Sequence, residues 1–350
     1  MNEKIMEKIV KMKKIEIHLH LDGSLRPETV LKWILEEEDY KSLGFKNKES
    51  FLKANTDELL IKTKKALTVK ENCRDLNEYL EKFNLPCKKL QTENHITQAT
   101  YELFEDLSKQ NVIYAEIRFA PSKHRENGLD YDKIVEAAIK GMNMAKEKYS
   151  IGGSLILCAM RGDNLEDNLQ TIKVAKRFLG KGVSAIDLAG AEALFPTSDY
   201  ENVFKEASKL NIPFTIHAGE AAGADSIKMA LNFGAKRIGH GVRCLEDSNL
   251  VDYLIENNII LEVCPISNLQ TRATGENHPI EELYKKGLKV TVNTDNNTVS
   301  NTDIINEYKW ILEHTKLNLN DLEQMNVNAV KGLFSLSEPE KRQLIEELQK

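Results

Sequence analysis

The sequence predicts an α/β protein whose core is a closed (β/α)8 TIM barrel. First, eight short apolar segments alternate along the chain with segments of helical character, and strands that are separated by helices form parallel sheets. Second, polar side chains that could share one site end the first, fifth, sixth and eighth of these segments. Only a closed sheet places the first strand beside the eighth. The alternative is an open doubly wound sheet, which would gather its ligands at one switch point near the middle of the sheet.

The composition is that of a globular protein with a large core. The 350 residues are 41% hydrophobic and 29% charged, and the formal net charge is −6. Without a basic excess, we expect no nucleic-acid partner. No segment resembles a secretory signal or a membrane span, so we expect no membrane partner. The five cysteines are widely spaced, with no C-x-x-C pair, which predicts free thiols and a cytoplasmic location.

The first strand, at residues 15–21, carries a pattern typical of metal sites. His18 and His20 are two residues apart, so their side chains share one face of the strand. The strand ends in the turn signal Asp22-Gly23. Two imidazoles at one rigid strand end can reach a single divalent ion. The alternative is a pair of packed or solvated histidines.

A helix at 27–39 follows, with Pro27 at its start. The segment at about 41–90 is mixed and is predicted to be a helical insertion after the first strand. It carries apolar residues at helical spacing, which periodicity alone assigns to packing: Leu76, Tyr79, Leu80 and Phe83.

From residue 92 onward helices and strands alternate. The predicted helices are 92–109, 131–148, 165–178, 200–209, 225–233, 247–256 and 279–285. The predicted strands are 112–119, 154–160, 183–188, 213–217, 237–240, 259–263 and 289–293. Helices near 303–314, 319–330 and 339–348 belong to the additional C-terminal region at about 301–350. We expect residues 1–350 to form one barrel domain.

Three further polar residues stand at strand ends. His217 and His240 end the strands at 213–217 and 237–240, and Asp295 follows the last strand. In a barrel these residues converge with the first strand at the C-terminal rim. Histidines with one carboxylate suit a divalent cation, most often Zn²⁺, with room for a water. For each residue alone, a helix-capping Asp or a packed histidine is the competing interpretation.

Six segments, in this order, resemble the adenosine deaminase family of the metal-dependent amidohydrolase superfamily. They are His18-Leu19-His20-Leu21-Asp22-Gly23-Ser24, Asp187-Leu188-Ala189-Gly190-Ala191-Glu192, His217-Ala218-Gly219-Glu220, Gly239-His240-Gly241, Cys264-Pro265-Ile266-Ser267-Asn268 and Asn293-Thr294-Asp295. The resemblance runs from about residue 13 to 335. It implies hydrolysis of the 6-amino group of adenosine and 2′-deoxyadenosine in purine salvage.

The resemblance also implies a metal site and an acid–base group. One Zn²⁺ per chain would be held by His18, His20, His217 and Asp295, and would activate the attacking water. Glu220 would protonate purine N1. His240 would orient the water or act as a base, and Asp295 would also accept a hydrogen bond from that water.

The resemblance assigns substrate contacts as well. Gly190 would bond N3 through its N–H, Asp22 would receive the ribose 5′-hydroxyl, and His20 would lie beside the substrate. Asn296 replaces the aspartate of well-known members, and its amide could donate to N7 without needing to be protonated. The apolar residues Leu76, Tyr79, Leu80 and Phe83 become a lid over the purine. Arg118, Met160, Ser267 and Asn268 are predicted to support the site, and His95, His124, His278 and His314 to be surface or structural residues.

Three alternatives stay open. A sister deaminase could act on free adenine or a modified adenosine. A two-metal phosphoester hydrolase is disfavoured because no lysine lies in the segment 187–190 at the end of the fourth strand. A binding protein on the same barrel would be expected to lack a ligand or the proton donor, and this chain has all of them.

Overall fold

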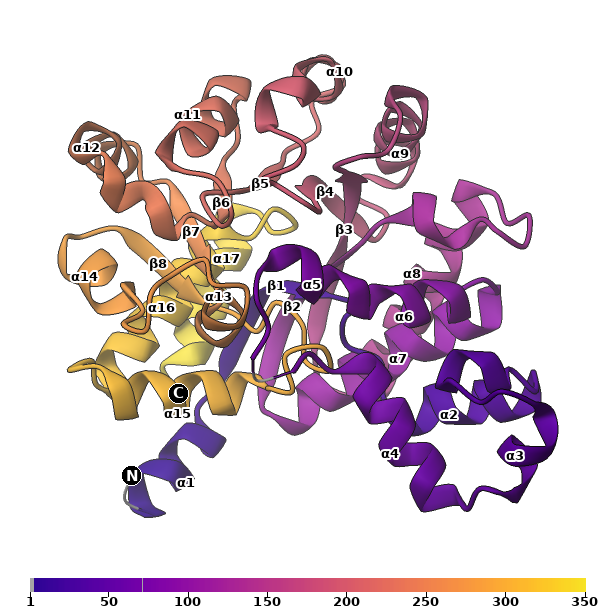
Figure 1. Cartoon of the computed structure of the whole chain (residues 1–350). Coiled ribbons are helices and arrows are strands. Elements are labelled where there is room, and N and C mark those ends of the chain that lie inside the picture. Colours follow the sequence, from indigo (N-terminus) through magenta and orange to yellow (C-terminus); the bar gives the residue numbers. More distant parts are fainter. Residues whose placement is uncertain (1–2, 71) are drawn as a thin grey trace.

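The computed structural model describes residues 3–70 and 72–350, and its strands form two parallel four-stranded sheets. The first sheet holds β1 (Lys14–His20), β2 (Val112–Phe119), β3 (Gly152–Met160) and β4 (Val183–Ala189). The second holds β5 (Thr215–Ala218), β6 (Arg237–His240), β7 (Ile260–Val263) and β8 (Lys289–Val292). Figure 1 shows the strands at the centre of the molecule, with helices around them.

The two sheets are joined at both edges, which closes the barrel. Parallel bridges pair Leu19 with Asp295 and Ile186 with Phe214. At the first junction the His20 amide donates to the Asp295 carbonyl at 2.8 Å, and the Asp295 amide donates to the His18 carbonyl at 3.0 Å. The predicted closed parallel barrel is therefore confirmed, and the first strand lies beside the chain that follows the eighth.

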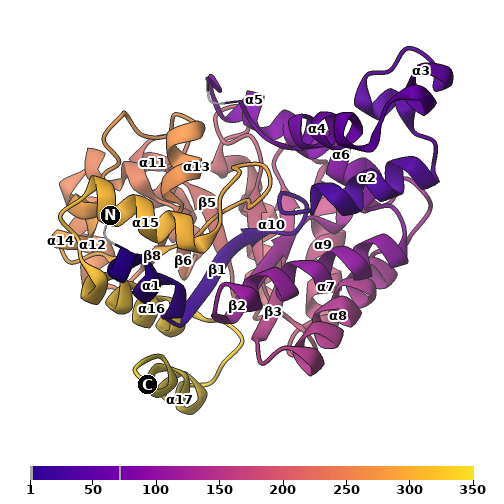
Figure 2. The same ribbon diagram turned by 90° about the horizontal axis from the view of Figure 1, so that it is seen from below.

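Helices between consecutive strands cover the outside of the barrel (Figures 1 and 2). They are α7 (Glu93–Lys109), α8 (Tyr131–Lys148), α9 (Leu165–Phe178), α10 (Glu201–Lys209), α11 (Ala224–Phe233), α12 (Ser248–Glu256) and α14 (Ile280–Lys285). These bounds differ from the predicted ones by one residue or none, apart from the 3₁₀ turn Thr197–Tyr200 before α10. Each helix buries one apolar stripe, as Ile172 and Ala175 of α9 illustrate.

The segment between β1 and α7 is helical, as expected. It contains α2 (Pro27–Glu36), the 3₁₀ turn Tyr40–Leu43, α3 (Lys48–Lys53), α4 (Thr56–Leu67), α5 (Leu76–Leu80), the 3₁₀ turn Glu81–Phe83 and α6 (Asn84–Lys89). The side chains of Asn47, Asn55 and Asp75 cap α3, α4 and α5 by accepting a backbone N–H. The helix predicted at 27–39 ends at Glu36, and Glu38 has a positive φ of 52°, which a continuing helix does not allow.

The last strand is followed by the helices α15 (Ile304–His314), α16 (Leu319–Gly332) and α17 (Glu338–Leu348). A short helix, α13 (Pro265–Gln270), lies between β7 and α14. Helix α1 (Glu3–Lys11), which we did not predict, packs against α15 (Figure 2). Within the described residues, no helix is both long and apolar enough to cross a membrane.

Candidate active site

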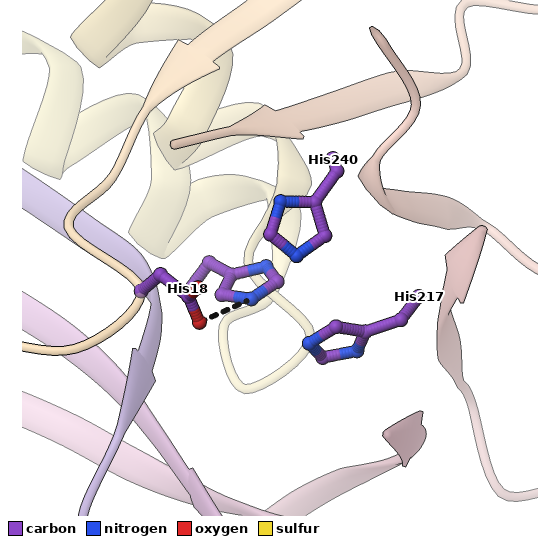
Figure 3. A group of neighbouring side chains, drawn as sticks. His18, His217 and His240 are labelled. Atoms are coloured by element: carbon purple, nitrogen blue, oxygen red, sulfur yellow. Dashed lines mark ion pairs between the residues drawn. The ribbon is translucent and has the colours of Figure 1, made fainter. Parts of the chain in front are cut away.

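The predicted strand-end residues meet at one end of the barrel. Ligand atoms of His18, His217, His240 and Asp295 all lie within 4.8 Å of one another, and all four residues are buried. Figure 3 shows the imidazoles of His18, His217 and His240 turned toward a common space. His20 is next to them, with its Nε2 3.2 Å from His217 Nε2 and 3.5 Å from Asp295 Oδ1. The structure thus brings the four proposed metal ligands and His240 together.

Two of these residues have an unusual backbone. His240 and Asp295 both have a φ of 60°, a left-handed conformation that side-chain-bearing residues rarely adopt. At Asp295 the two hydrogen bonds to β1 hold this conformation in place. Positive φ values at two strand ends that face the same space are typical of functional sites.

His18 is oriented by a buried carboxylate. Its Nδ1 lies 2.8 Å from Glu262 Oε2. Burial opposes ionisation of Glu262, but the guanidinium groups of Arg118 and Arg237 outweigh it and hold the pKa of this carboxyl well below its usual range. An ionised carboxylate only accepts, so His18 Nδ1 carries the proton and donates it. In the neutral ring, which is the form that binds a metal ion, His18 Nε2 carries a lone pair; this buried atom has no hydrogen-bond partner and lies 3.4 Å from Asp295 Oδ1.

His217 is oriented in the same way. Its Nδ1 lies 2.9 Å from Asp187 Oδ2. Arg118 Nη1 donates to the same Asp187 oxygen at 2.8 Å, while Arg118 Nη2 donates to Glu262 Oε2 at 2.8 Å. Burial again opposes ionisation, but His217 and Arg118 hold the pKa of Asp187 well below its usual range. Arg118 therefore ties together the two carboxylates that orient the two histidines.

This donor set fits a divalent metal. Because carboxylates accept from Nδ1 of His18 and His217, the Nε2 atom of each ring is free to bind an ion, an arrangement common in zinc sites. Asp295 Oδ1 lies 3.4 Å from His18 Nε2, and Ser267 Oγ donates to Asp295 Oδ2 at 2.5 Å. The unpartnered, buried Nε2 of His18 has no other evident use. Three imidazole nitrogens and one carboxylate oxygen suit Zn²⁺ better than Mg²⁺ or Ca²⁺.

A cavity of about 700 Å³ opens beside this cluster. Glu220 lines it, and its Oε1 is buried without a hydrogen-bond partner, while its Oε2 lies 3.5 Å from His240 Nε2. Burial, followed by the charges of Asp295 and Glu192, raises the pKa of Glu220 well above its usual range. A carboxyl that stays protonated in a dry cavity can act as a proton donor.

The remaining predicted substrate residues line the same cavity: His20, Asp22, Gly190 and Asn296. Gly190 has a φ of 106°, and a Cβ there would come within 3.3 Å of Arg161 Cβ, so this position favours glycine. Asp22 Oδ1 and Asn296 Oδ1 are buried without partners. Asn296 donates one amide hydrogen to the Tyr79 hydroxyl at 3.0 Å, which leaves the other hydrogen available.

The four predicted lid residues also line the cavity: Leu76, Tyr79, Leu80 and Phe83. They come from α5 and the 3₁₀ turn after it, and they pack in a small apolar cluster with Val69, Cys73 and Val299. The Tyr79 hydroxyl lies 2.6 Å from Ser300 Oγ. The same side chains therefore serve packing and form one wall of the cavity.

Glu192 organises the loop that carries Glu220. Its buried carboxylate accepts the backbone N–H groups of four consecutive residues, 219–222, at 2.7–3.0 Å, and the Ser226 hydroxyl at 2.5 Å. Buried backbone N–H groups need an acceptor, and Glu192 supplies it for all four. Glu192 follows Gly190 by two residues, so its side chain joins the loop after β4 to the loop after β5.

Sequence reasoning gave no role to Asp187, Glu192 and Glu262. The first two lie inside a segment that we compared with the family. Glu262 left a weaker signal, a single charge within the apolar strand Ile260–Val263. His278 and His124, expected to be surface or structural, are both buried, whereas His314 and His95 stack on Trp310 and Trp33. Of the predicted supporting residues, Met160 lines the cavity.

A closed parallel barrel with a histidine–aspartate cluster at its strand ends defines the class: a metal-dependent hydrolase of the amidohydrolase type. Comparison with known proteins gives the family. The sequence profile described as adenosine deaminase matches residues 13–350. An adenosine deaminase of Haemophilus ducreyi is 40% identical over 342 residues, which cover 96% of this chain and 95% of that protein. The chain belongs to the adenosine deaminase family.

Two solved structures are similar over nearly their whole length. An adenine deaminase from Arthrobacter aurescens has a TM-score of 0.82 and 25% identity, covering 97% of this chain and 98% of its own. An N6-mAMP deaminase from Arabidopsis has a TM-score of 0.83 and 25% identity, covering 98% and 99%. The chain is thus an enzyme, a hydrolase that acts on a cyclic amidine C–N bond.

Proposed function

We propose that this enzyme deaminates adenosine and 2′-deoxyadenosine to inosine and 2′-deoxyinosine, releasing ammonia, in purine salvage. The observation that carries the proposal is the pairing of two features at one cavity. A buried carboxyl with an unpartnered oxygen, Glu220, lies beside a cluster of imidazole and carboxylate ligands. Such a pair can protonate a ring nitrogen while a water attacks the neighbouring carbon.

We propose that one Zn²⁺ per chain is held by His18, His20, His217 and Asp295. When bound, the ion would supply Lewis-acid activation of a water, lowering its pKa toward ~7. Glu262 and Asp187 support this ligand set because they direct His18 Nε2 and His217 Nε2 into the site.

The chain's own residues would then guide the proton and the water. Glu220 hands its proton to purine N1, which weakens the aromaticity that protects C6. Asp295 accepts a hydrogen bond from the attacking water. As the C6–O bond forms and the C6–N bond breaks, one water proton goes to the amino group, which leaves as ammonia, and the other restores the proton of Glu220. His240 orients that water and stabilises the charge that develops on its oxygen, as its place 3.5 Å from Glu220 allows.

Substrate recognition would use the cavity walls. The Gly190 N–H bonds N3, the free amide hydrogen of Asn296 bonds N7, and Asp22 receives the ribose 5′-hydroxyl. The apolar lid of Leu76, Tyr79, Leu80 and Phe83 excludes water from the purine. Burial raises the pKa of Asp22 to about 7, so its carboxyl group can accept a hydrogen bond from the 5′-hydroxyl or donate one to it.

A sister activity on adenine or a modified adenosine is the second candidate, favoured by the named activities of the two similar solved structures. Conversion to the 6-oxopurine, followed by absorbance, separates the candidates with adenosine, adenine and N6-methyl-AMP as substrates; the first two would release ammonia and the third methylamine. We expect adenosine to be the preferred substrate by kcat/KM. A preference for adenine would reject the proposed role of Asp22.

The direct test of the chemistry is the loss of adenosine absorbance with and without a chelator, in wild type and Glu220→Gln. We expect the chelator to abolish activity. We expect Glu220→Gln to lower kcat by at least about 100-fold, the usual contribution of a general acid. Glu206→Gln, a matched change on the outer helix α10, is the control and should behave as wild type. Full activity of Glu220→Gln would reject the proposed proton donor.

A further inference from the structure

A chain of hydrogen bonds leads from α14 to His240. The Ile280 amide donates to His278 Nδ1 at 3.1 Å. His278 Nε2 lies 3.2 Å from Asn268 Oδ1, and Asn268 Nδ2 lies 2.9 Å from His240 Nδ1. Asn268 is fully buried, and His278 and His240 are 8% and 1% exposed. No solvent is therefore needed to complete this chain.

The Ile280 amide, which is the first donor, fixes the direction of every hydrogen bond in this series. A backbone N–H can only donate, so His278 Nδ1 must carry a lone pair. Burial lowers the pKa of His278 to about 3, so its ring is neutral and its single proton is on Nε2. His278 Nε2–H then donates to Asn268, which must present its oxygen. The Asn268 amide group therefore faces His240.

The opposite orientation of the Asn268 amide group, with its nitrogen toward His278, is incompatible with the Ile280 hydrogen bond. If Asn268 turned its nitrogen toward His278, both ring nitrogens of His278 would have to accept hydrogen bonds. A neutral imidazole has one N–H and an imidazolium has two, so neither form allows this. Because the amide of Asn268 only donates, His240 Nδ1 is an acceptor.

We propose that His278 and Asn268 are positioning residues that fix His240 as the Nε2–H tautomer, so that His240 presents a hydrogen-bond donor to the reaction rather than a base or a metal ligand. His240 Nε2–H then points toward the cavity and Glu220, whose Oε2 lies 3.5 Å away. The functional consequence rests on the proposed function, in which His240 stabilises the charge that develops on the attacking oxygen. The tautomer itself follows from the hydrogen bonds alone.

The tautomer can be measured without reference to activity. The ¹⁵N chemical shifts of histidine-labelled holoenzyme distinguish a protonated ring nitrogen from an unprotonated one, and a His240→Asn sample identifies the His240 signals. We expect protonated Nε2 and unprotonated Nδ1 at His240. A protonated Nδ1 in the wild-type enzyme would overturn the proposal.

Two near-isosteric variants test the consequence. Asn268→Asp places an acceptor opposite His240 Nδ1, so the proton should move to Nδ1. We expect kcat to fall by at least about 100-fold, and by up to ~10⁴-fold, the loss known for a catalytic histidine held in the wrong tautomer. His278→Leu removes the donor that orients Asn268, and we expect kcat to fall by about 10-fold or more. His278→Gln can still donate to Asn268 and should stay within about threefold of wild type.

The readouts separate this inference from the proposed function. Wild-type kcat in Asn268→Asp together with a shifted tautomer would overturn the role assigned to the donor. If the kcat of His278→Gln falls as far as that of His278→Leu, the site requires the shape of the imidazole and not its hydrogen bond to Asn268, and the positioning role is wrong. Failure of the proposed function would appear elsewhere, as full activity of Glu220→Gln. If Asn268→Asp does not fold, the His278 pair still decides the matter.

Discussion

The most informative single change is Glu262→Gln, because Glu262 makes four hydrogen bonds in the barrel interior. It accepts from His18 Nδ1 at 2.8 Å, Arg118 Nη2 at 2.8 Å, Arg237 Nε at 2.6 Å and Thr215 Oγ1 at 2.9 Å. A glutamine oxygen can keep the two contacts on one side. Its NH₂ group then faces His18 and Arg118, which are donors.

The expected magnitude follows from these contacts. Arg118 keeps its ion pair with Asp187 but loses one charged acceptor, which costs about 1.5–3 kcal/mol in stability. At His18 the new donor favours a lone pair on Nδ1 and a proton on Nε2, the atom that faces the proposed metal. Removing such an orienting partner lowers metal affinity by about 10- to 100-fold.

The assay pairs thermal unfolding of the metal-free enzyme with zinc competition against a chelator. Glu116→Gln is the matched control, because Glu116 pairs with Arg237 and does not touch a histidine. We expect both variants to lose stability and only Glu262→Gln to lose zinc affinity. Equal zinc affinity in Glu262→Gln and wild type would refute the argument that this carboxylate fixes His18. Equal losses of zinc affinity in the two variants would refute it too.

Three further predictions concern the cavity. Glu192→Gln should lower kcat by about 100-fold, because it releases the loop that positions Glu220. The control is Glu246→Gln, since Glu246 accepts the Ala224 N–H at the outer end of the same loop. This variant should stay within about twofold of wild type in the same steady-state assay. Because burial raises the pKa of Glu220 well above its usual range, its proton is kept to higher pH than that of an ordinary carboxyl and is lost as the pH rises through the raised pKa. The kcat–pH profile should therefore fall on the alkaline side, and a profile without an alkaline limb would contradict this sign. Adenosine should be preferred to 7-deazaadenosine by about 1–3 kcal/mol in kcat/KM, because removal of N7 leaves the buried Asn296 amide without its acceptor, and equal kcat/KM values would reject the proposed contact.

The sequence predicted the elements that local patterns encode. The strands at Val112–Phe119 and Arg237–His240 and the helices at Tyr131–Lys148 and Leu165–Phe178 have the predicted bounds, because apolar periodicity and capping residues mark them. Barrel closure followed from ligand-type residues on the first and last strands. Helix α1 carried a helical pattern that we did not use, because its apolar residues Ile5, Met6, Ile9 and Val10 recur at helical spacing.

The residues that the sequence did not reveal act across the barrel. Glu262 is 244 residues from His18 in sequence, and Asp187 is 30 residues from His217. In the sequence, each is a single charged residue within an apolar strand. The neighbouring residues do not indicate which imidazole it will contact. Asn268 and His278 are ten residues apart, but the direction of their hydrogen bond depends on the Ile280 amide and on burial. Such partners become visible only when the strands are assembled.

These partners explain how one cluster can contain histidines with different tasks. His18 and His217 face carboxylates, which only accept, so their protons lie on Nδ1 and their Nε2 lone pairs face the site. His240 faces the amide of Asn268, which donates, so its Nε2 carries a proton into the same space. Distance alone groups all three with Asp295 as possible ligands. The chemical type of the partner behind each ring distinguishes the two proposed metal ligands, His18 and His217, from the proposed hydrogen-bond donor, His240. Asn268→Asp should therefore leave His240 with its proton on Nδ1, as in His18 and His217.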